Sequence, residues 1–412
     1  MALRGAALAL TAANYSTVDI WALFDDTKFF RDVAAWFGDQ SPAREESLLL
    51  VGPGYGFILY AGSLLLGWSA WGHLIAQVFV SAVNCLLVRV LALELGLKER
   101  EATLAALISA VSLSAIAASV MLYTETWYLT LTLLALILFL RGIRTRHTGR
   151  CLAAAALFCA AALVRSVGQF VPLAIAGAFI FDALVQRQRI RLTVRPALFL
   201  TLAVALTLAW PLRNYVVHGV FTISETGTRA ARLYWTASAL TGNGDAAAID
   251  SVRSIWDKQV EWRYHTPTPT LKQRHEFDVS VIRDTLAQRP GRMMSAYLMN
   301  VWTNMTEESR IQSILMPQFT AFWRQYSKRF ASGLGPWLVG FTLLGALALW
   351  RRGRRESVVF LLALYLYYGL ITGATFWQGS RIFLPGQIAW APLVAVCLVS
   401  AVDFFRSADP RV

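Results

Sequence analysis

The sequence predicts an all-α, polytopic membrane protein with about ten transmembrane helices. Three observations lead to this fold class. Hydrophobic residues make up 56% of the 412-residue chain, apolar stretches of membrane-spanning length recur along it, and arginines gather in the short segments between these stretches. A soluble globular domain does not combine these features. The net charge of +13 could point to nucleic acid, but the arginine-rich segments account for it, so no nucleic-acid partner is expected.

The apolar stretches fall into two groups by length. Five are long enough to span a bilayer: about 72–95, 102–121, 334–350, 358–376 and 382–402. Four are shorter and predict short or tilted spans: about 126–140, 151–165, 168–185 and 197–212. The first 24 residues are apolar but interrupted by polar side chains. Because no small-residue cleavage site follows, we interpret them as a first spanning helix rather than a cleavable signal.

Basic clusters orient these predicted helices. Five segments hold 16 of the 38 lysines and arginines against five acidic residues: Lys98/Arg100, Arg141–Arg150, Arg187–Arg195, Arg351–Arg355 and Arg406/Arg411. Short basic loops stay on the cytoplasmic side of a membrane. All five segments fall on that side if the apolar stretch 48–66 lies along the membrane surface instead of crossing it. Residues 25–71 and 213–332 are then external.

This topology divides the chain into three regions. Residues 1–212 form a transmembrane module with a first external loop at 25–71, residues 213–332 form an extracytoplasmic segment, and residues 333–412 form the C-terminal transmembrane helices. The extracytoplasmic segment is far longer than a connection requires. Its last part predicts an amphipathic helix on the outer leaflet, because apolar residues recur there at helical spacing: Met294, Tyr297/Leu298 and Val301/Trp302.

Cysteine and histidine patterns predict neither a disulfide nor a metal site. The four cysteines lie inside apolar stretches without ligand spacing, and the five histidines show no metal-binding motif. His218 is a weak candidate because it closely follows Arg213 and Asn214. Gly52-Pro53-Gly54 lacks the lysine and the helix context of a phosphate-binding loop. The sequence also lacks the Gly-x-Ser-x-Gly motif of serine hydrolases.

Three acidic residues are candidates for chemistry. Asp25 and Asp26 come where the first helix leaves the membrane, and a partly desolvated carboxylate there could take a proton from a sugar or lipid hydroxyl. The alternative is a helix cap or a solvated loop face. Glu125 is the only acidic residue between residues 102 and 181. It could orient an acceptor or share a divalent cation with Asp25 or Asp26, or only compensate the dipole of the following helix.

Arg165, Arg213 and Arg381 all fall on the external side in this topology. A guanidinium near the apolar phase is costly unless it has a partner or a function, and its planar geometry suits a lipid phosphate. Snorkelling to headgroups explains each arginine singly, and Arg213 could also complement the dipole of the helix that ends near Pro211. Three arginines on one face, opposite a carboxylate pair, favour an anion-binding site.

Six short motifs follow one another along the chain. They are Asp26 with Phe30 and Ala34, Gly52-Pro53-Gly54-Tyr55, Thr124-Glu125, Leu163-Val164-Arg165-Ser166, Trp210-Pro211-Leu212-Arg213-Asn214-Tyr215, and Arg381 with Pro385 and Pro392. Together they resemble the GT-C class of integral-membrane glycosyltransferases, and in particular bacterial relatives of dolichyl-phosphate-mannose protein mannosyltransferases and aminoarabinose transferases. Gly52 and Ser166 replace prolines of the class, and Gln378 or Gly379 replaces the glutamate that precedes its last arginine.

The resemblance implies transfer of a sugar, with inversion, from a polyprenyl-phosphate donor to a lipid, glycan or protein acceptor on the non-cytoplasmic face. Asp26, or Asp25, would be the general base on the acceptor hydroxyl. Arg165, Arg213 and Arg381 would stabilise the leaving phosphate. The remaining candidate substrate-binding residues are Glu125, Tyr55, Asn214 and His218.

The expected location is a bacterial inner membrane, with membrane lipids as partners and the site facing the periplasm. The sequence does not predict the sugar, the acceptor or a metal requirement. Two other functions compete with this one. A lipid-linked glycan ligase or polymerase also uses external arginines and a large loop. A transporter would place ionisable residues near mid-membrane and often show repeated halves, and neither feature is evident in the sequence.

Overall fold

The computed structural model describes most of the chain as helices. The described residues are 1–16, 20–21, 25–41, 45–185, 194–242, 246–308, 317, 321–322, 325, 329, 333–375 and 379–408, and they contain no strand. Within them, the side chains at 25–26, 183–185, 194–197, 246 and 408 are not described. The all-α fold class is therefore confirmed.

The N-terminal half begins with the first loop and continues into the bundle. Its helices are α1 (Ala2–Asn14), α3 (Asp25–Asp39), α4 (Glu45–Val51), α5 (Gly54–Leu66), α6 (Ala70–Glu94), α7 (Glu99–Val111), α8 (Leu113–Ser119), α9 (Glu125–Arg144), α10 (Thr148–Val164), the 3₁₀ turn η2 (Ser166–Phe170), α11 (Val171–Val185) and α12 (Val194–His218). The C-terminal half contains α13 (Thr226–Ala230), the π-helix η3 (Ala231–Thr236), α14 (Ala237–Thr241), α15 (Ala246–Tyr264), α16 (Leu271–Gln288), α17 (Pro290–Thr306), α19 (Leu334–Arg351), α20 (Arg355–Ile371), η6 (Thr372–Ala374), α21 (Ser380–Phe383), η7 (Leu384–Gly386) and α22 (Gln387–Ala408).

Membrane-spanning helices form the larger part of the molecule. Among the described residues, six helical segments are long and apolar enough to cross a bilayer, or up to eight if each of two bent pairs counts as one span. The bent pairs are α4 with α5, at 120°, and α7 with α8, at 58°. α10 and α11 are shorter apolar helices. The protein is therefore polytopic, and the expected number of ten spans is not confirmed.

Ion pairs collect several basic segments at one end of the bundle. Glu94, at the end of α6, pairs with Arg141 at 2.6 Å and with Arg144 at 2.8 Å, both at the end of α9. Glu101, at the start of α7, pairs with Arg352 of the loop between α19 and α20. These contacts place three of the five basic segments, those at Lys98/Arg100, Arg141–Arg150 and Arg351–Arg355, close to one another, and the side of the membrane they face stays a prediction. The segment around Arg189 lies outside the described residues.

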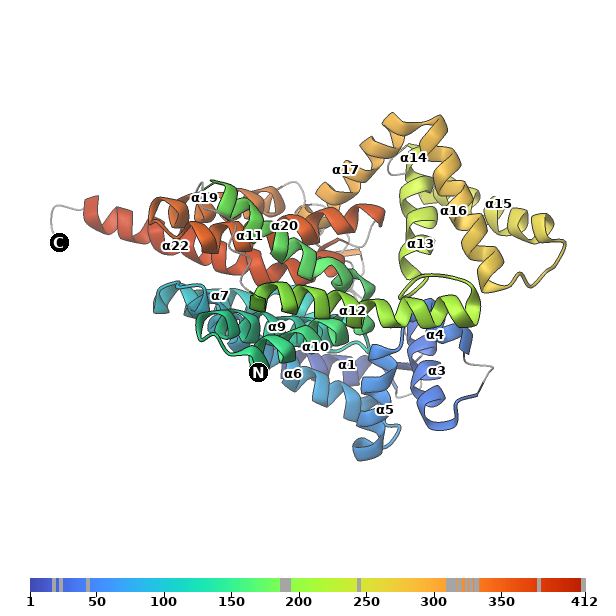
Figure 1. Ribbon diagram of the computed structural model, residues 1–412, viewed down its shortest axis with the longest axis horizontal. Coiled ribbons are helices and arrows are strands. Elements are labelled where there is room, and N and C mark those ends of the chain that lie inside the picture. Colours follow the sequence, from blue (N-terminus) through green and yellow to red (C-terminus); the bar gives the residue numbers. More distant parts are fainter. Residues whose placement is uncertain are drawn as a thin grey trace.

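The helices α13 to α17 form a lobe (residues 226–306) at the other end of the bundle. Figure 1 shows this lobe beside α3 and α4 of the first loop, away from the C-terminal end of α22. The lobe has its own small core around Trp256 and Phe277. Its last helix, α17, buries Met293 and Ala296 but exposes Met294, Leu298 and Trp302. α17 thus has the amphipathic pattern that the sequence predicts.

Candidate active site

Glu125 lies between two arginines from distant parts of the chain. Its Oε1 atom is 3.1 Å from Nη1 of Arg165 and accepts a hydrogen bond of 2.9 Å from Nε of Arg381. The carboxylate is 1% exposed, and each guanidinium side chain is 17% exposed. A buried carboxylate is stable only when paired, and here two cations share one anion. The trio keeps a surplus positive charge.

Local structure fixes each arginine. Arg165 caps α10 in an extended conformation, and the backbone before it packs tightly on the first loop. A Cβ on Gly54 would lie 2.4 Å from the backbone nitrogen of Val164, so this approach requires glycine. Arg381 lies on α21, and its guanidinium lies 4.0 Å from the centre of the Tyr123 ring. This cation–π contact further orients the guanidinium.

The trio lines a cavity of about 450 Å³ between the bundle, the first loop and the lobe. Basic side chains outnumber acidic ones among its described lining residues. The basic residues are Lys28, Arg165, Arg229 and Arg381, and the acidic one is Glu125. Phe30, Leu233 and Tyr234 add aromatic and apolar surface. A partly enclosed cavity with surplus positive charge suits an anionic ligand that also carries apolar groups.

Asp25 and Asp26 open α3, and their side chains lie outside the described part of the structure. Their backbone positions come one turn before Lys28, Phe29 and Phe30, which all line the cavity. Residues three and four apart occupy the same face of a helix. The two positions are therefore on the cavity-facing side of α3.

Tyr55 lies behind the cavity wall. It is 1% exposed, its hydroxyl donates a 3.1 Å hydrogen bond to Oε1 of Gln77, and its ring meets the Phe30 ring edge-on at 5.0 Å. Phe30 lines the cavity, but Tyr55 does not. Tyr55 thus supports the position of Phe30.

Arg213, Asn214 and His218 form a different cluster. Arg213 pairs with Glu45 at the start of α4 and donates a 3.0 Å hydrogen bond to Oδ1 of Asn214. The Nε2 atom of His218 is 3.4 Å from Oε1 of Glu45. None of these residues lines the 450 Å³ cavity, although Leu50 and Val51 of α4 do. The structure therefore brings Arg165 and Arg381 together and leaves Arg213 to brace α4.

Sequence reasoning missed the contribution of the lobe. Arg229, Leu233 and Tyr234 of α13 and η3 line the cavity. The lobe docks on the first loop through hydrogen bonds from the Glu225 amide to the Leu49 carbonyl (2.9 Å) and from Thr226 Oγ1 to the Leu50 carbonyl (2.8 Å). No short motif marks these residues. A π-helix, such as η3, is the one local feature that often accompanies a functional site.

Buried ion pairs hold the far side of the same segment. Arg232 pairs with Asp278 at 2.6 Å, and His275 Nδ1 is 2.9 Å from Oε2 of Glu225. The hydrogen bond to Glu225 raises the pKa of His275. Burial raises the pKa of Asp278 to about 6, against the opposing charge of Arg232. Among the described residues, no group of three or more His, Cys, Asp or Glu side chains could hold a metal ion.

Comparison with known proteins identifies the architecture. Residues 51–214, which include Glu125, Arg165 and Arg213, match the family model for dolichyl-phosphate-mannose-protein mannosyltransferase. The archaeal oligosaccharyltransferase AglB from Archaeoglobus fulgidus, in complex with an inhibitory peptide and a dolichol-phosphate, is similar over 100% of this chain and 51% of that chain, with 14% identity and a TM-score of 0.53. The chain has the fold of the GT-C glycosyltransferases. The resemblance expected from the six motifs is thereby confirmed.

Two further solved structures are also similar to this chain. The Archaeoglobus fulgidus oligosaccharyltransferase tethered to an acceptor peptide has a TM-score of 0.51 at 15% identity, over 100% of this chain and 51% of that chain. ArnT from Cupriavidus metallidurans bound to undecaprenyl phosphate has a TM-score of 0.38 at 14% identity, over 90% of this chain and 73% of that chain. This chain spans about half the length of the archaeal protein. No curated protein sequence matches it.

Proposed function

We propose that the protein transfers a sugar from a polyprenyl-phosphate donor to a lipid, glycan or protein acceptor on the non-cytoplasmic face of the membrane. One observation carries the proposal. Arg165 and Arg381 converge on Glu125 in a cavity whose other wall is the start of α3, where Asp25 and Asp26 lie. The cationic groups thus share a cavity with residues one turn after the candidate bases, which supports an attack opposite a leaving phosphate.

The proposed reaction assigns a role to each side of the cavity. Asp26, or Asp25, takes the proton of the acceptor hydroxyl while its oxygen attacks the anomeric carbon. The bond to the lipid phosphate breaks on the opposite face of the sugar, which inverts the anomeric configuration. The phosphate leaves as an anion, so positive charge serves it better than an acid. Arg165 and Arg381 supply this charge in a partly dry site, where it acts strongly.

Glu125 is better suited to position the arginines than to bind a metal. Its Oε1 atom already faces two guanidinium groups, which would repel a divalent cation nearby. A carboxylate shared by two arginines fixes their orientation, and both arginines line the cavity in which an anion would bind. Lys28 and Arg229 add charge at the same cavity and would assist anion binding.

The test is sugar transfer by the purified full chain in detergent, supplied with a panel of polyprenyl-phosphate sugars. Release of polyprenyl phosphate and labelling of the acceptor are measured together. The proposal expects both to depend on Arg165 and Arg381. Arg283→Lys is the matched control, because Arg283 is an exposed lobe arginine that pairs only with its neighbour Asp284 in the described structure. Turnover that is indifferent to both cavity arginines would refute the proposal.

A further inference from the structure

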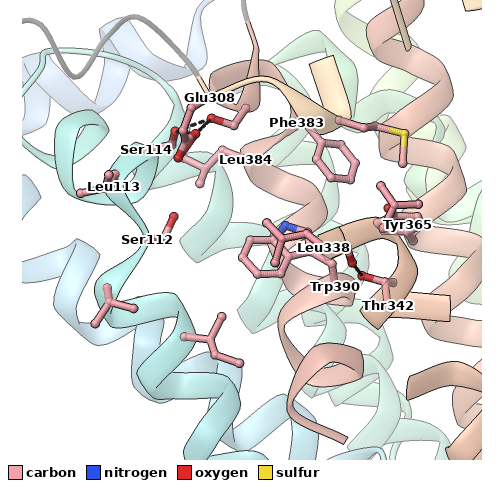
Figure 2. A pocket seen from close by; sticks show the side chains of 15 residues that line it. Ser112, Leu113, Ser114, Glu308, Leu338, Thr342, Tyr365, Phe383, Leu384 and Trp390 are labelled. Atoms are coloured by element: carbon pink, nitrogen blue, oxygen red, sulfur yellow. Dashed lines mark hydrogen bonds between the residues drawn. The ribbon is translucent and has the colours of Figure 1, made fainter. Parts of the chain in front are cut away.

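The short helix α21 contributes to the walls of two cavities. Arg381 and Ile382 line the active-site cavity, whereas Ser380 and Phe383 line a second pocket of about 260 Å³. Figure 2 shows this second pocket, with mostly apolar walls and a group of oxygen atoms at one end. Its labelled apolar residues are Leu113, Leu338, Phe383, Leu384 and Trp390. A substitution that moves the pocket side of α21 can therefore also move Arg381, which lies on its active-site side.

The segment that ends α17 holds the backbone at the start of α21. The Gly379 amide donates a 3.0 Å hydrogen bond to Oδ1 of Asn304, and the Ser380 amide donates one of 2.9 Å to the carbonyl of Glu307. Gly379 has a φ of +56°, and a Cβ there would lie 3.0 Å from the same Glu307 oxygen. A four-residue helix has little stability of its own. These contacts therefore determine where α21 lies.

Glu308 adds a side-chain anchor at the polar end of the pocket. Its Oε2 atom accepts a 3.1 Å hydrogen bond from Ser114 of α8 and another from the hydroxyl of Ser380. The Ser114 and Ser380 hydroxyl oxygens are 2.5 Å apart. Figure 2 shows Glu308 and Ser114 close together at this end. Hydrogen bonds to a carboxylate are strong, and apolar surroundings strengthen them further.

We propose that Glu308 is a positioning residue for Arg381, because it anchors the adjacent Ser380 and so fixes the guanidinium beside Glu125. Glu308 does not line the active-site cavity, so it acts through α21 rather than on the substrate. The opposite end of α17 contacts η3, which lines another wall of the active-site cavity, because the Met293 carbonyl accepts a 2.7 Å hydrogen bond from Trp235. The proposal rests on the proposed function of Arg381 as a ligand for the lipid phosphate.

A double-mutant cycle tests this coupling. The probe is undecaprenyl phosphate, and its Kd for the full-length chain in detergent is measured for Glu308→Ala, Arg381→Gln and the double variant. Loss of a charged hydrogen bond next to the binding arginine should weaken binding roughly tenfold. The double variant should bind no more weakly than Arg381→Gln alone. Glu308→Gln should regain part of the affinity, because its amide oxygen still accepts a hydrogen bond. Glu261→Gln, an exposed acid of the lobe, is the control and should change nothing.

The outcomes separate this inference from the proposed function. If Arg381→Gln leaves the Kd unchanged, the proposed role of Arg381 fails, and the inference fails with it. If Arg381→Gln weakens binding but the effect of Glu308→Ala adds to it in full, only the positioning role fails. If Glu308→Ala does not fold, the same cycle with Ser380→Ala removes the same contact from the α21 side. Full additivity in that cycle likewise overturns the positioning role.

Discussion

Glu125 and Arg381 lie 256 positions apart in the chain, yet Oε1 of the first accepts a 2.9 Å hydrogen bond from Nε of the second. The contact joins the start of α9 to α21 and closes one side of the cavity. Arg165 approaches the same oxygen from α10. A single buried carboxylate therefore sets the geometry of both cavity arginines, and the predictions below depend on that geometry.

Replacing Arg165 or Arg381 by lysine should lower the affinity for the lipid phosphate although the charge is kept. An ammonium group cannot reproduce the planar contacts that a guanidinium makes to a carboxylate and a phosphate at once. Loss of one charge-assisted pair costs about 1.5–3 kcal/mol, so we expect a roughly tenfold to hundredfold rise in Kd for undecaprenyl phosphate. Wild-type affinity in both lysine variants would leave these arginines only a structural role as partners of Glu125.

Arg213→Lys separates the two arginine clusters. Arg213 pairs with Glu45 and does not line the cavity, so its replacement should change the Kd for undecaprenyl phosphate less than Arg165→Lys does. Binding of undecaprenyl phosphate to the three lysine variants is compared under one set of conditions. An effect of Arg213→Lys as large as that of Arg165→Lys would mean that the lipid phosphate contacts the Glu45 cluster.

Glu125→Gln should reduce turnover by at least about tenfold, because it leaves two neighbouring guanidinium groups without their shared anion. Glu94→Gln is the matched control. Glu94 also pairs with two arginines, Arg141 and Arg144, but at the opposite end of the bundle. It should keep near wild-type transfer in the detergent assay. Equal losses in the two variants would indicate a general effect of breaking ion pairs rather than a role in the site.

The long apolar helices could be predicted from the sequence because burial in lipid leaves a continuous pattern. The stretch expected at 72–95 corresponds to α6 (Ala70–Glu94), and that at 334–350 to α19 (Leu334–Arg351). The stretch expected at 102–121 is instead broken between α7 and α8, where the Ser112 hydroxyl accepts a hydrogen bond from the Ala115 amide. One serine cap hardly changes the hydropathy of an apolar stretch, so the break between α7 and α8 could not be predicted from the sequence.

The sequence predicts individual residues of the site but not which of them lie together. Glu125, Arg165 and Arg381 each stand out as charges in apolar surroundings. Which of them meet depends on tertiary contacts, whereas membrane sidedness and the family resemblance group Arg213 with Arg165 and Arg381. The sequence has Gln378 or Gly379 where the GT-C class has a glutamate before this arginine, which weakens the case for a carboxylate beside Arg381. The structure brings Glu125 to Arg381 and Glu308 to the adjacent Ser380 from distant segments.

The lobe should become less stable as the pH rises. His275 has a pKa raised above its usual value of 6.5 by its hydrogen bond to Glu225, so its protonation stabilises the fold fully below that value and less as the pH passes the raised pKa. Burial raises the pKa of Asp278 from 3.8 to about 6. Between pH 3.8 and about pH 6 this shift also makes the folded state less stable as the pH rises. We expect a lower unfolding midpoint at about pH 8 than at about pH 5.5.

His275→Asn isolates the histidine contribution to this pH dependence. The variant should lose the part of the decline that falls above pH 6.5, where His275 releases its proton. His147 is an exposed histidine that precedes α10, far from His275 in the sequence. The control variant His147→Asn should keep the full pH-dependent loss of stability. Unfolding is followed by intrinsic fluorescence in detergent. An unchanged profile for His275→Asn would assign the pH dependence to other groups.

Single cysteines should report the proposed orientation of the chain in the membrane. With the four native cysteines replaced, residues placed at positions 40 and 268 should react with an impermeant maleimide added to intact cells. Cysteines placed at positions 145 and 353 should react only after the cells are opened, because short basic loops stay on the cytoplasmic side of the membrane. Strong labelling at position 353 in intact cells would reverse the orientation and move the cavity to the cytoplasmic face.

Asp26→Asn tests the central claim most directly, because it removes the proposed base while preserving side-chain size at the start of α3. Transfer from a polyprenyl-phosphate sugar is measured with purified protein, and folding is checked by gel filtration. General base catalysis contributes about 100- to 10,000-fold, so the account predicts a loss of that order, with a milder loss for Asp25→Asn. Full-rate transfer by folded Asp26→Asn and Asp25→Asn proteins would contradict it and would favour a ligase-like mechanism centred on residues 213–332.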